Sequence, residues 1–228
     1  MFCKGERAKA MTDLSASGSA RKMISVVVPA WNEIEVIDEL CRRLEELMAR
    51  QPNYDFEIII VENGSWDGSW ERLQEIHKKD KRFKNIQLSR NFMADGGVMA
   101  GLNMASGDAA VVMNADLQDP PELVDRFIEK WEEGFEIIYG VIEGRQGESL
   151  FKVLASDWYY KFVHWITRGA IPKGVSDFRL MDRKVYLAVN HMREHNRFTR
   201  GLSIWTGFRQ TGISFLRPPR FAGETKAP

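Results

Sequence analysis

Hydrophobic and polar positions follow two different periods along this chain, and the two periods predict strands and helices in turn. Short continuous apolar runs rich in Val and Ile predict buried strands, and apolar residues that recur every three or four positions predict amphipathic helices. The expected strands are 24–28, 56–61, 86–88, 109–113 and 135–141, and the expected helices are 34–48, 70–76, 97–105 and 122–132. Strands that alternate with helices are typical of an α/β fold, so we expect a mostly parallel central sheet with helices on both faces.

Length and composition fit one substantial domain. The chain has 228 residues, of which 44% are hydrophobic, enough for an ordinary core. Residues 1–22 are polar and rich in Ser, Ala and Gly, so we expect a disordered leader there and no signal peptide. No apolar run approaches the roughly 18 to 20 residues that span a bilayer.

Charge, cysteine and histidine content exclude several classes of function. The formal net charge is zero, which argues against nucleic-acid binding. Residues 1–167 hold 20 Lys and Arg against 28 Asp and Glu, whereas residues 168–228 hold 12 against 4. The basic C-terminal quarter suggests a surface for phosphates or anionic lipid head groups, or simply a basic surface without a partner. Two cysteines, Cys3 and Cys41, do not make a disulfide framework, and four histidines without an HExxH pattern indicate no zinc site.

A cluster of polar residues follows the expected strand 109–113. Asn114, Asp116, Gln118 and Asp119 come directly after the apolar run, and Pro120 and Pro121 then suit the first turn of the next helix. Open α/β sheets bind ligands at the carboxyl ends of their strands. Carboxylate and amide oxygens on one short loop can hold a hard cation such as Mg²⁺, which in turn holds phosphates. The alternative is an ordinary strand-end turn with a helix cap.

Several motifs, in their order along the chain, resemble those of family 2 inverting nucleotide-sugar glycosyltransferases. The resemblance is strongest to the polyprenyl-phosphate sugar transferases, the group that includes dolichol-phosphate mannose synthase. It covers residues 24–226 and rests on 29–33 (PAWNE), 61–69 (VENGSWDGS), 89–92 (SRNF), 114–121 (NADLQDPP), 176–183 (SDFRLMDR), 196–201 (NRFTRG), 205–208 (WTGF) and 220–226 (RFAGETK). The resemblance implies a glycosyltransferase A-type (Rossmann-like) fold. Residues 23–228 would then form one catalytic domain, with a nucleotide-binding part at about 23–145 and an acceptor-facing or membrane-facing part at about 146–228.

The resemblance also implies an activity. Such an enzyme moves a sugar from a nucleoside-diphosphate sugar to a polyprenyl phosphate or a related acceptor, with inversion and with Mg²⁺ or Mn²⁺, in the synthesis of cell-envelope glycans. The metal ligands carried over are Asp116, Gln118 and Asn114. Asp116 and Asp177 are the candidate catalytic carboxylates, with Asp177 as the base or the group that orients the acceptor. The implied donor-binding residues are Pro29, Trp31, Glu33, Val61, Asn63, Asn114, Ala115, Arg145, Arg220 and Lys226.

Some of these residues have a plain structural alternative. Trp31 could pack on the base or ribose and Glu33 could accept hydrogen bonds from ribose hydroxyls, but Glu33 also suits the first turn of a helix. Asp67 is expected to cap the helix after it. Asp177 is expected to project from the end of a strand, and its alternative role is an ion pair with Arg179 or Arg183.

Four positions depart from the pattern of the family. Asn63 and Asn114 stand where relatives carry acids, Ala94 stands where they carry Lys, and Ile142 stands where they carry Arg, although Arg145 is close. An amide both donates and accepts hydrogen bonds whereas a carboxylate only accepts, so the preferred base could differ. Two alternatives therefore stay open. One is a catalytically weak or non-catalytic relative that binds a nucleotide sugar or a protein partner, and the other is a transferase for a soluble or protein-linked acceptor.

Residues 150–168 combine aromatic and basic side chains. This composition suits a helix that lies in the membrane interface, or a helix that packs on the sheet or on a second copy in a homo-oligomer. We expect a cytoplasmic protein that contacts the cytoplasmic face of the membrane peripherally. Many relatives continue into transmembrane helices beyond the position of Pro228, so this chain is expected to be either a member without them or a shortened one.

Overall fold

The computed structural model describes residues 21–143, 174–194 and 197–222. The expected leader, the aromatic and basic segment 150–168, Arg145 and Lys226 lie outside these ranges. The strands are β1 (Met23–Ala30), β2 (Asp55–Glu62), β3 (Phe83–Gln87), β4 (Ala109–Val112), β5 (Ile137–Ile142), β6 (Val175–Asp182) and β7 (Gln210–Phe215). The helices are α1 (Ile34–Arg50), α2 (Ser69–Lys79), α3 (Met93–Met104), α4 (Leu123–Glu132), α6 (Arg183–His191) and α7 (Thr199–Trp205).

The strands form one seven-stranded sheet in the order β3-β2-β1-β4-β6-β5-β7. β1 pairs in parallel with β2 and β4, β2 with β3, and β5 with β7. β6 lies between β4 and β5 and is antiparallel to both. The predicted mostly parallel α/β sheet is therefore confirmed, with one reversed strand among those described.

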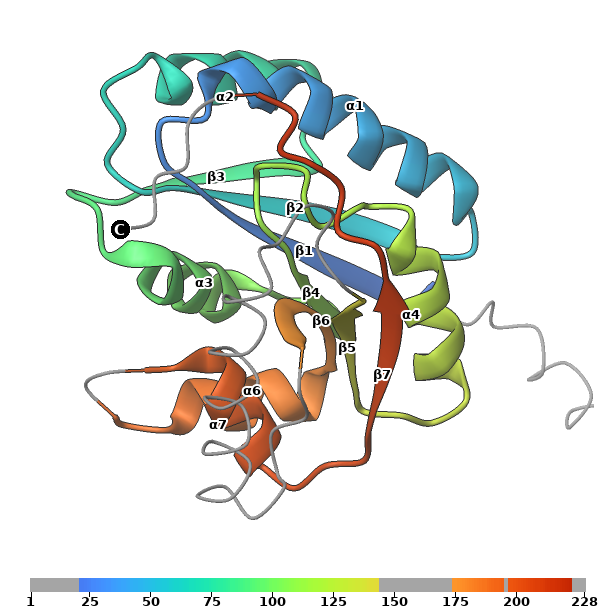
Figure 1. The fold of residues 1–228 in the computed structure, drawn as a ribbon. Helices are drawn as coiled ribbons and strands as arrows, with labels where there is room; N and C mark the ends of the chain where they lie inside the picture. Colours follow the sequence, from blue (N-terminus) through green and yellow to red (C-terminus); the bar gives the residue numbers. More distant parts are fainter. Residues whose placement is uncertain (1–20, 144–173, 195–196, 223–228) are drawn as a thin grey trace, which may run out of the picture.

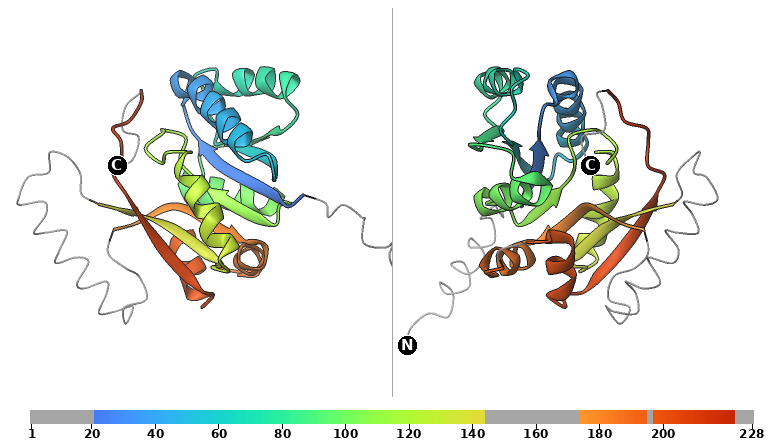
Figure 2. Two further views of the ribbon diagram at one scale, coloured as in Figure 1. Left: turned by 90° about the vertical axis from the view of Figure 1, so that its right-hand side faces the viewer. Right: turned by 60° about the vertical axis from the view of Figure 1, so that its left-hand side comes forward.

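Helices cover both faces of this sheet (Figures 1 and 2). One face packs against α1, α2 and α4, and the other against α3 and α6. Successive residues of β1 show the division, since Val26 and Val28 belong to the first core and Val27 to the second. Because both faces are buried, the central strands read as continuous apolar runs.

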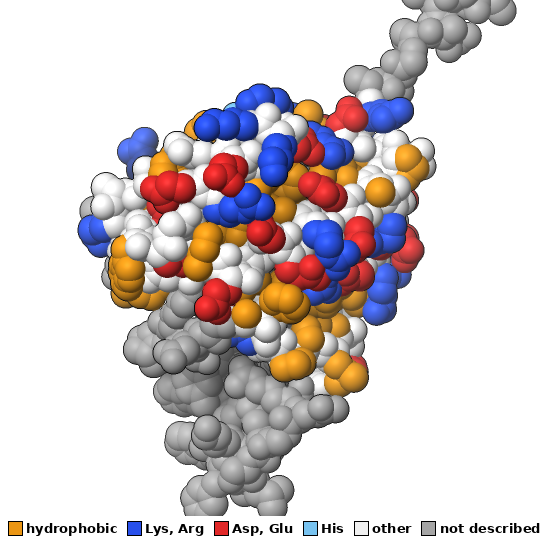
Figure 3. Space-filling view, turned by 90° about the horizontal axis from the view of Figure 1, so that it is seen from above, with side chains coloured by type: hydrophobic (Ala, Val, Ile, Leu, Met, Phe, Trp, Pro, Cys, Tyr) orange, Lys and Arg blue, Asp and Glu red, His pale blue; other side chains and the backbone are white. Residues whose placement is uncertain are grey.

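The face seen from above in Figure 1, which α1 and α2 form, carries Lys and Arg side chains beside Asp and Glu (Figure 3). Arg42 of α1 pairs with Glu39 and Glu46, one turn away on either side. Arg72 of α2 reaches across to Asp38 at 2.7 Å, which links the two helices at the surface. Exposed pairs of this kind contribute little stability.

Element boundaries differ from expectation where the sequence is polar. β3 runs over Phe83–Gln87 and not over 86–88, because this edge strand is only half-buried and alternates with polar residues. α3 begins at Met93, before the glycine pair at which its start was expected. Asp177 is the third residue of β6, so it lies near the beginning of this strand and not in the loop before it. The motif pattern did not predict β7, α6 or α7.

Candidate active site

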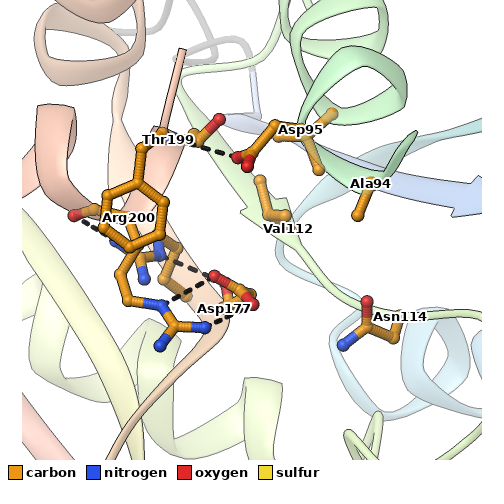
Figure 4. A pocket seen from close by; sticks show the side chains of 10 residues that line it. Ala94, Asp95, Val112, Asn114, Asp177, Thr199 and Arg200 are labelled. Atoms are coloured by element: carbon orange, nitrogen blue, oxygen red, sulfur yellow. Dashed lines mark hydrogen bonds and ion pairs between the residues drawn. The ribbon is translucent and has the colours of Figure 1, made fainter. Parts of the chain in front are cut away.

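The carboxyl ends of β1, β2 and β4 meet at one edge of the sheet. Because β6 is antiparallel to β4, its first residues lie at that same edge. The register pairs Val112 of β4 with Arg179 of β6. Asn114 lies two residues after Val112 and Asp177 lies two residues before Arg179, so the antiparallel pairing brings Asn114 and Asp177 close together. Asn114 and Asp177 line the same pocket from opposite sides (Figure 4).

The loop after β4 is held by Asp119. The buried carboxylate of Asp119 accepts hydrogen bonds from the Asn114 backbone N–H at 3.0 Å and from its side-chain Nδ2 at 2.8 Å. Since a carboxylate only accepts, these bonds fix which way the Asn114 amide points, with Nδ2 towards Asp119 and Oδ1 turned away from it. Asp116 accepts the Gln118 backbone N–H at 3.1 Å, and Leu117 between them has a φ of 60°. A turn held in this way keeps the oxygens of Asn114 and Asp116 at the strand end.

Burial raises the pKa of the Asp119 carboxyl to about 6. The effect of desolvation outweighs the hydrogen bonds from Asn114 and the attraction of Arg217, which both lower this pKa. Its Oδ1 atom lies 4.0 Å from an Arg217 guanidinium nitrogen. Asp119 belongs to the polar cluster after β4, but no role was predicted for it from the sequence. A second acid three positions after Asp116 and just before Pro-Pro was the available signal.

The loops after β1 and β2 are locked together by reciprocal hydrogen bonds. The Asn32 N–H donates to Ser65 Oγ at 2.8 Å, and the Trp66 N–H donates to Asn32 Oδ1 at 3.1 Å. Asp67 accepts the Ile34 N–H with one oxygen and the Ser69 N–H with the other. Asp67 therefore serves the beginnings of both α1 and α2, which is more than the single cap expected.

The loops after β1 and β2 each carry a tryptophan, and the two side chains are in contact. The rings of Trp31 and Trp66 meet edge to face with centroids 5.3 Å apart. Trp66 is 76% exposed, whereas the indole nitrogen of Trp31 is buried. Aromatic faces at this position could pack on a base.

Asn63 is buried, and both ends of its side-chain amide are hydrogen-bonded. Its Oδ1 accepts the Phe92 N–H at 2.9 Å and its Nδ2 donates to the Met93 carbonyl at 2.9 Å. Met93, at the start of α3, has a φ of 63°, so this amide holds an unusual backbone turn. A carboxylate could make only the first of these bonds. An amide at position 63 thus has a local structural reason besides any contact with a base.

The segment after β7 crosses the same edge of the sheet towards the beginning of α1 (Figure 1). Arg220 donates to Glu33 Oε1 at 2.5 Å and to the Ala222 carbonyl at 3.0 Å. The Phe221 N–H lies 3.5 Å from the Asp116 carbonyl. The Gln118 side-chain nitrogen donates to the Pro218 carbonyl at 3.4 Å, so Gln118 turns towards this segment. The structure therefore brings Glu33, Asp116 and Arg220 to one place.

Asp177 forms an ion pair, but with neither of the two arginines expected. Its two carboxylate oxygens accept from Nε and Nη2 of Arg200 at 2.8 and 2.6 Å, a bidentate arrangement. Desolvation of Asp177 opposes ionisation, but the hydrogen bond and charge of Arg200, with the charges of Arg179 and Arg217, lower its pKa from the usual value. Arg200 lies in the motif 196–201, but no role was predicted for it from the sequence.

Arg179 lies beneath this pair and is completely buried. Its guanidinium donates to the carbonyls of Ser176, Asp177 and Arg200 and to the Ser203 hydroxyl. Burial lowers the pKa of Arg179 to about 10, so it stays charged at neutral pH. This cation fixes the start of β6 against α7, and thereby places Asp177 beside Arg200.

Comparison with known proteins defines the family. Residues 25–193 match the family described as Glycosyl transferase family 2. The chain belongs to this family. It is 46% identical over 204 residues to a Bacillus subtilis protein named uncharacterized glycosyltransferase YkcC, covering 90% of this chain and 63% of that one. It is 34% identical over 206 residues to the prophage bactoprenol glucosyl transferase homolog of Escherichia coli, covering 89% of this chain and 66% of that one.

The fold is also that of known glycosyltransferases. The structure resembles glucosyl-3-phosphoglycerate synthase from Mycobacterium tuberculosis, solved with Mn²⁺, uridine diphosphate and glucosyl-3-phosphoglycerate, with a TM-score of 0.56 and 17% identity. The match covers 89% of this chain and 73% of that one. The expected A-type fold and family are thus confirmed. The chain spans a little under two thirds of the length of the two relatives it matches by sequence.

Not every residue implied by the family pattern presents its side chain to this site. Val61 and Ala115 are buried in the two cores, so a donor could contact only their backbone. Pro29 lies against α3, where a side chain at Gly97 would meet it at 2.9 Å.

In the described part of the chain, no helix is long and apolar enough to cross a membrane.

The described residues offer a divalent cation few protein ligands. They contain no group of three or more His, Cys, Asp or Glu side chains that could hold a metal ion. Asp116 and the side-chain oxygen of Asn114 nevertheless lie on the same short loop after β4, and both are oxygen ligands of the kind that Mg²⁺ accepts. Mg²⁺ often binds one or two carboxylates and completes its shell with water and substrate phosphates. The residues present fit a cation bound together with a diphosphate, and do not form a cage for a cation alone.

Proposed function

We propose that this chain transfers a sugar from a nucleoside-diphosphate sugar to a polyprenyl phosphate, with inversion at the transferred carbon. The observation that carries the proposal is that Asn114, just after β4, and Asp177, near the start of β6, line one pocket. This arrangement puts candidate donor and acceptor groups on opposite sides of one pocket. The name of the Escherichia coli relative, a bactoprenol glucosyl transferase homolog, supports a lipid-phosphate acceptor.

On the donor side, the loops after β1 and β2 would hold the nucleoside. Trp31 offers an aromatic face, and Glu33 offers a carboxylate to ribose hydroxyls. Arg220 is tied to Glu33 and lies on the segment that passes over Asp116, where its guanidinium can meet the diphosphate. Asn63 would act mainly by shaping the loop in front of α3. Arg145 and Lys226 remain candidates for the same phosphates.

The Asp116 carboxylate and the side-chain oxygen of Asn114 would hold Mg²⁺ or Mn²⁺. Gln118 would be a further ligand once its hydrogen bond to the Pro218 carbonyl is broken. The Mn²⁺ with which the Mycobacterium tuberculosis enzyme was crystallised agrees with this assignment. The cation, when bound, neutralises negative charge on the diphosphate as the sugar departs. Arg220 adds a preorganised positive charge at the same leaving group. Asp119 keeps Asn114 in position through two hydrogen bonds.

On the acceptor side, Asp177 would act as the base or as the group that orients the acceptor. A phosphate acceptor is already an anion at neutral pH, so it needs positioning more than deprotonation. A lipid acceptor also requires the protein to approach a membrane surface, and we propose peripheral contact with the cytoplasmic face.

A donor screen tests the first half of the proposal. Calorimetry with a panel of nucleoside-diphosphate sugars, with and without Mn²⁺, should find one that binds more tightly with the metal. Asp116→Ala should abolish this metal-dependent gain. Glu122→Ala is the matched control, because Glu122 follows the same loop but pairs with Arg43 at the surface. Equal metal dependence in wild type and Asp116→Ala would refute the assignment of the metal site.

An acceptor assay separates enzyme from binding protein. With its donor bound, the chain should glycosylate a polyprenyl phosphate. If it binds a nucleotide sugar but glycosylates no acceptor, even with native membranes present, it is a non-catalytic relative. If it glycosylates only a soluble or protein-linked acceptor, the lipid assignment fails and the transferase assignment stands.

A further inference from the structure

Arg200 is the most accessible cation of the pocket opposite the metal-binding loop. The charged side chains that line this pocket are Asp95, Asp177, Arg179 and Arg200. Arg179 is buried and bonded to carbonyls, and Asp95 accepts the Thr199 N–H at 3.0 Å. The pocket therefore presents the Arg200–Asp177 pair to an incoming ligand, as Figure 4 shows.

The rest of the lining fits a ligand with an anionic head and an apolar chain. Ala94, Val98, Val112 and Phe198 form an apolar wall beside the ion pair. Phe198 is half-exposed, so it extends this wall to the surface. Arg200 sits at the start of α7, next to Phe198. One guanidinium beside an apolar wall suits a phosphate monoester of a hydrocarbon chain.

The chemistry of Asp177 argues against a proton-accepting role. A general base works best when its pKa lies near the working pH. The bidentate bond to Arg200 and the nearby Arg179 lower the pKa of Asp177, so its affinity for a proton is weaker than that of an ordinary aspartate. The same bond holds the Nε edge of Arg200 in one orientation. The Arg200 side chain is 27% exposed, so its guanidinium can be reached from the pocket while it holds Asp177.

We propose that Arg200 binds the phosphate of the acceptor and that Asp177 positions Arg200 without taking a proton. This inference rests on the proposed function, because it assumes that the acceptor is a phosphate. It assigns Asp177 the orienting role of the two roles considered above. Arg200 thereby becomes a residue that selects a phosphate acceptor over the corresponding alcohol.

Binding of a small acceptor analogue tests the role of Arg200. Geranyl phosphate and geraniol share one chain and differ in the phosphate. Arg200→Gln should weaken binding of geranyl phosphate by about 10-fold to 100-fold, as expected for the loss of charge-assisted hydrogen bonds, without changing binding of the nucleotide. Arg209→Gln, which removes an arginine at the far end of β7, should leave the binding of geranyl phosphate and of the nucleotide unchanged. Equal geranyl phosphate affinity in wild type and Arg200→Gln would overturn the inference.

A double-mutant cycle tests the role of Asp177. In transfer to geranyl phosphate, Arg200→Gln and Asp177→Asn should each raise the acceptor KM more than they lower kcat, and the double variant should lose no more than about threefold beyond Arg200→Gln. A further loss of about 100-fold in kcat on adding Asp177→Asn to Arg200→Gln would identify a base and overturn the positioning role. If wild type binds geranyl phosphate but transfers no sugar, the proposed function fails, and the binding comparison still decides the case of Arg200.

Discussion

Replacing Asn63 by aspartate tests whether the amide at this position is required by the fold. Asn63→Asp keeps the bond from the Phe92 N–H but loses the bond to the Met93 carbonyl, and it brings a carboxylate oxygen to about the 2.9 Å at which the amide nitrogen now lies. The lost hydrogen bond is worth about 1 kcal/mol, and the opposed oxygen atoms cost about as much again. We therefore expect a loss of about 2 kcal/mol in the free energy of unfolding.

Urea denaturation measures this loss, provided that the m-value stays the same. Asn91→Asp is the matched control on the same loop, because Asn91 Oδ1 only accepts a hydrogen bond, from the Met93 N–H at 2.7 Å. A carboxylate can still accept it, so the control should change stability by less than about 0.5 kcal/mol.

The pH dependence of Asn63→Asp sharpens the test. A carboxyl placed against a carbonyl oxygen is favoured in its protonated form, which can donate to Met93, so its pKa is raised in the folded state. The stabilising contribution of that proton is present at low pH and is lost as pH rises through the raised pKa. The deficit should therefore be smaller near about pH 4 than near about pH 8. Equal stability of the Asn63→Asp and Asn91→Asp variants across this range would refute the reasoning.

Three further changes probe the site and the core. Because the pKa of Asp119 is raised to about 6, the folded state binds its proton more tightly than the unfolded state does. The free energy of unfolding should therefore fall on the order of 3 kcal/mol as pH rises from about 4 to above 6. Asp119→Asn should remove this pH dependence in urea denaturation. Gly101→Ala would put a methyl group 2.3 Å from Val27 and should destabilise by about 1 to 3 kcal/mol in the same assay. Arg220→Ala should weaken donor binding in calorimetry, while a remote Arg209→Ala should not.

The sequence predicted the parts of the fold that burial decides. β1, β2 and β4 lie between two layers of helices, so their composition is apolar without interruption and their positions could be read directly. β7 could not be found in this way, because Gln210–Phe215 is short, contains a glycine and alternates between exposed and buried positions. The reversal of β6 depends on long-range pairing with β4 and β5, which no local pattern encodes.

The sequence predicted the candidate site residues at the strand ends, but not the residues that hydrogen-bond to them. Asn114 and Asp177 were expected to serve one site, and the register of β4 and β6 brings them to one pocket. Their partners, Asp119 and Arg200, are defined by contacts that only the folded chain shows. Asn63 looked like a change of base specificity, whereas its hydrogen bonds show a role in a backbone turn.

The proposed activity is tested most directly by transfer of a labelled sugar to a polyprenyl phosphate, from the nucleoside-diphosphate sugar that the donor screen identifies. The wild-type chain with Mn²⁺ should form a lipid-linked sugar whose anomeric configuration is inverted relative to the donor, and Asp116→Ala should form none. Donor binding without any lipid-linked product, or a product with retained configuration, would contradict the account.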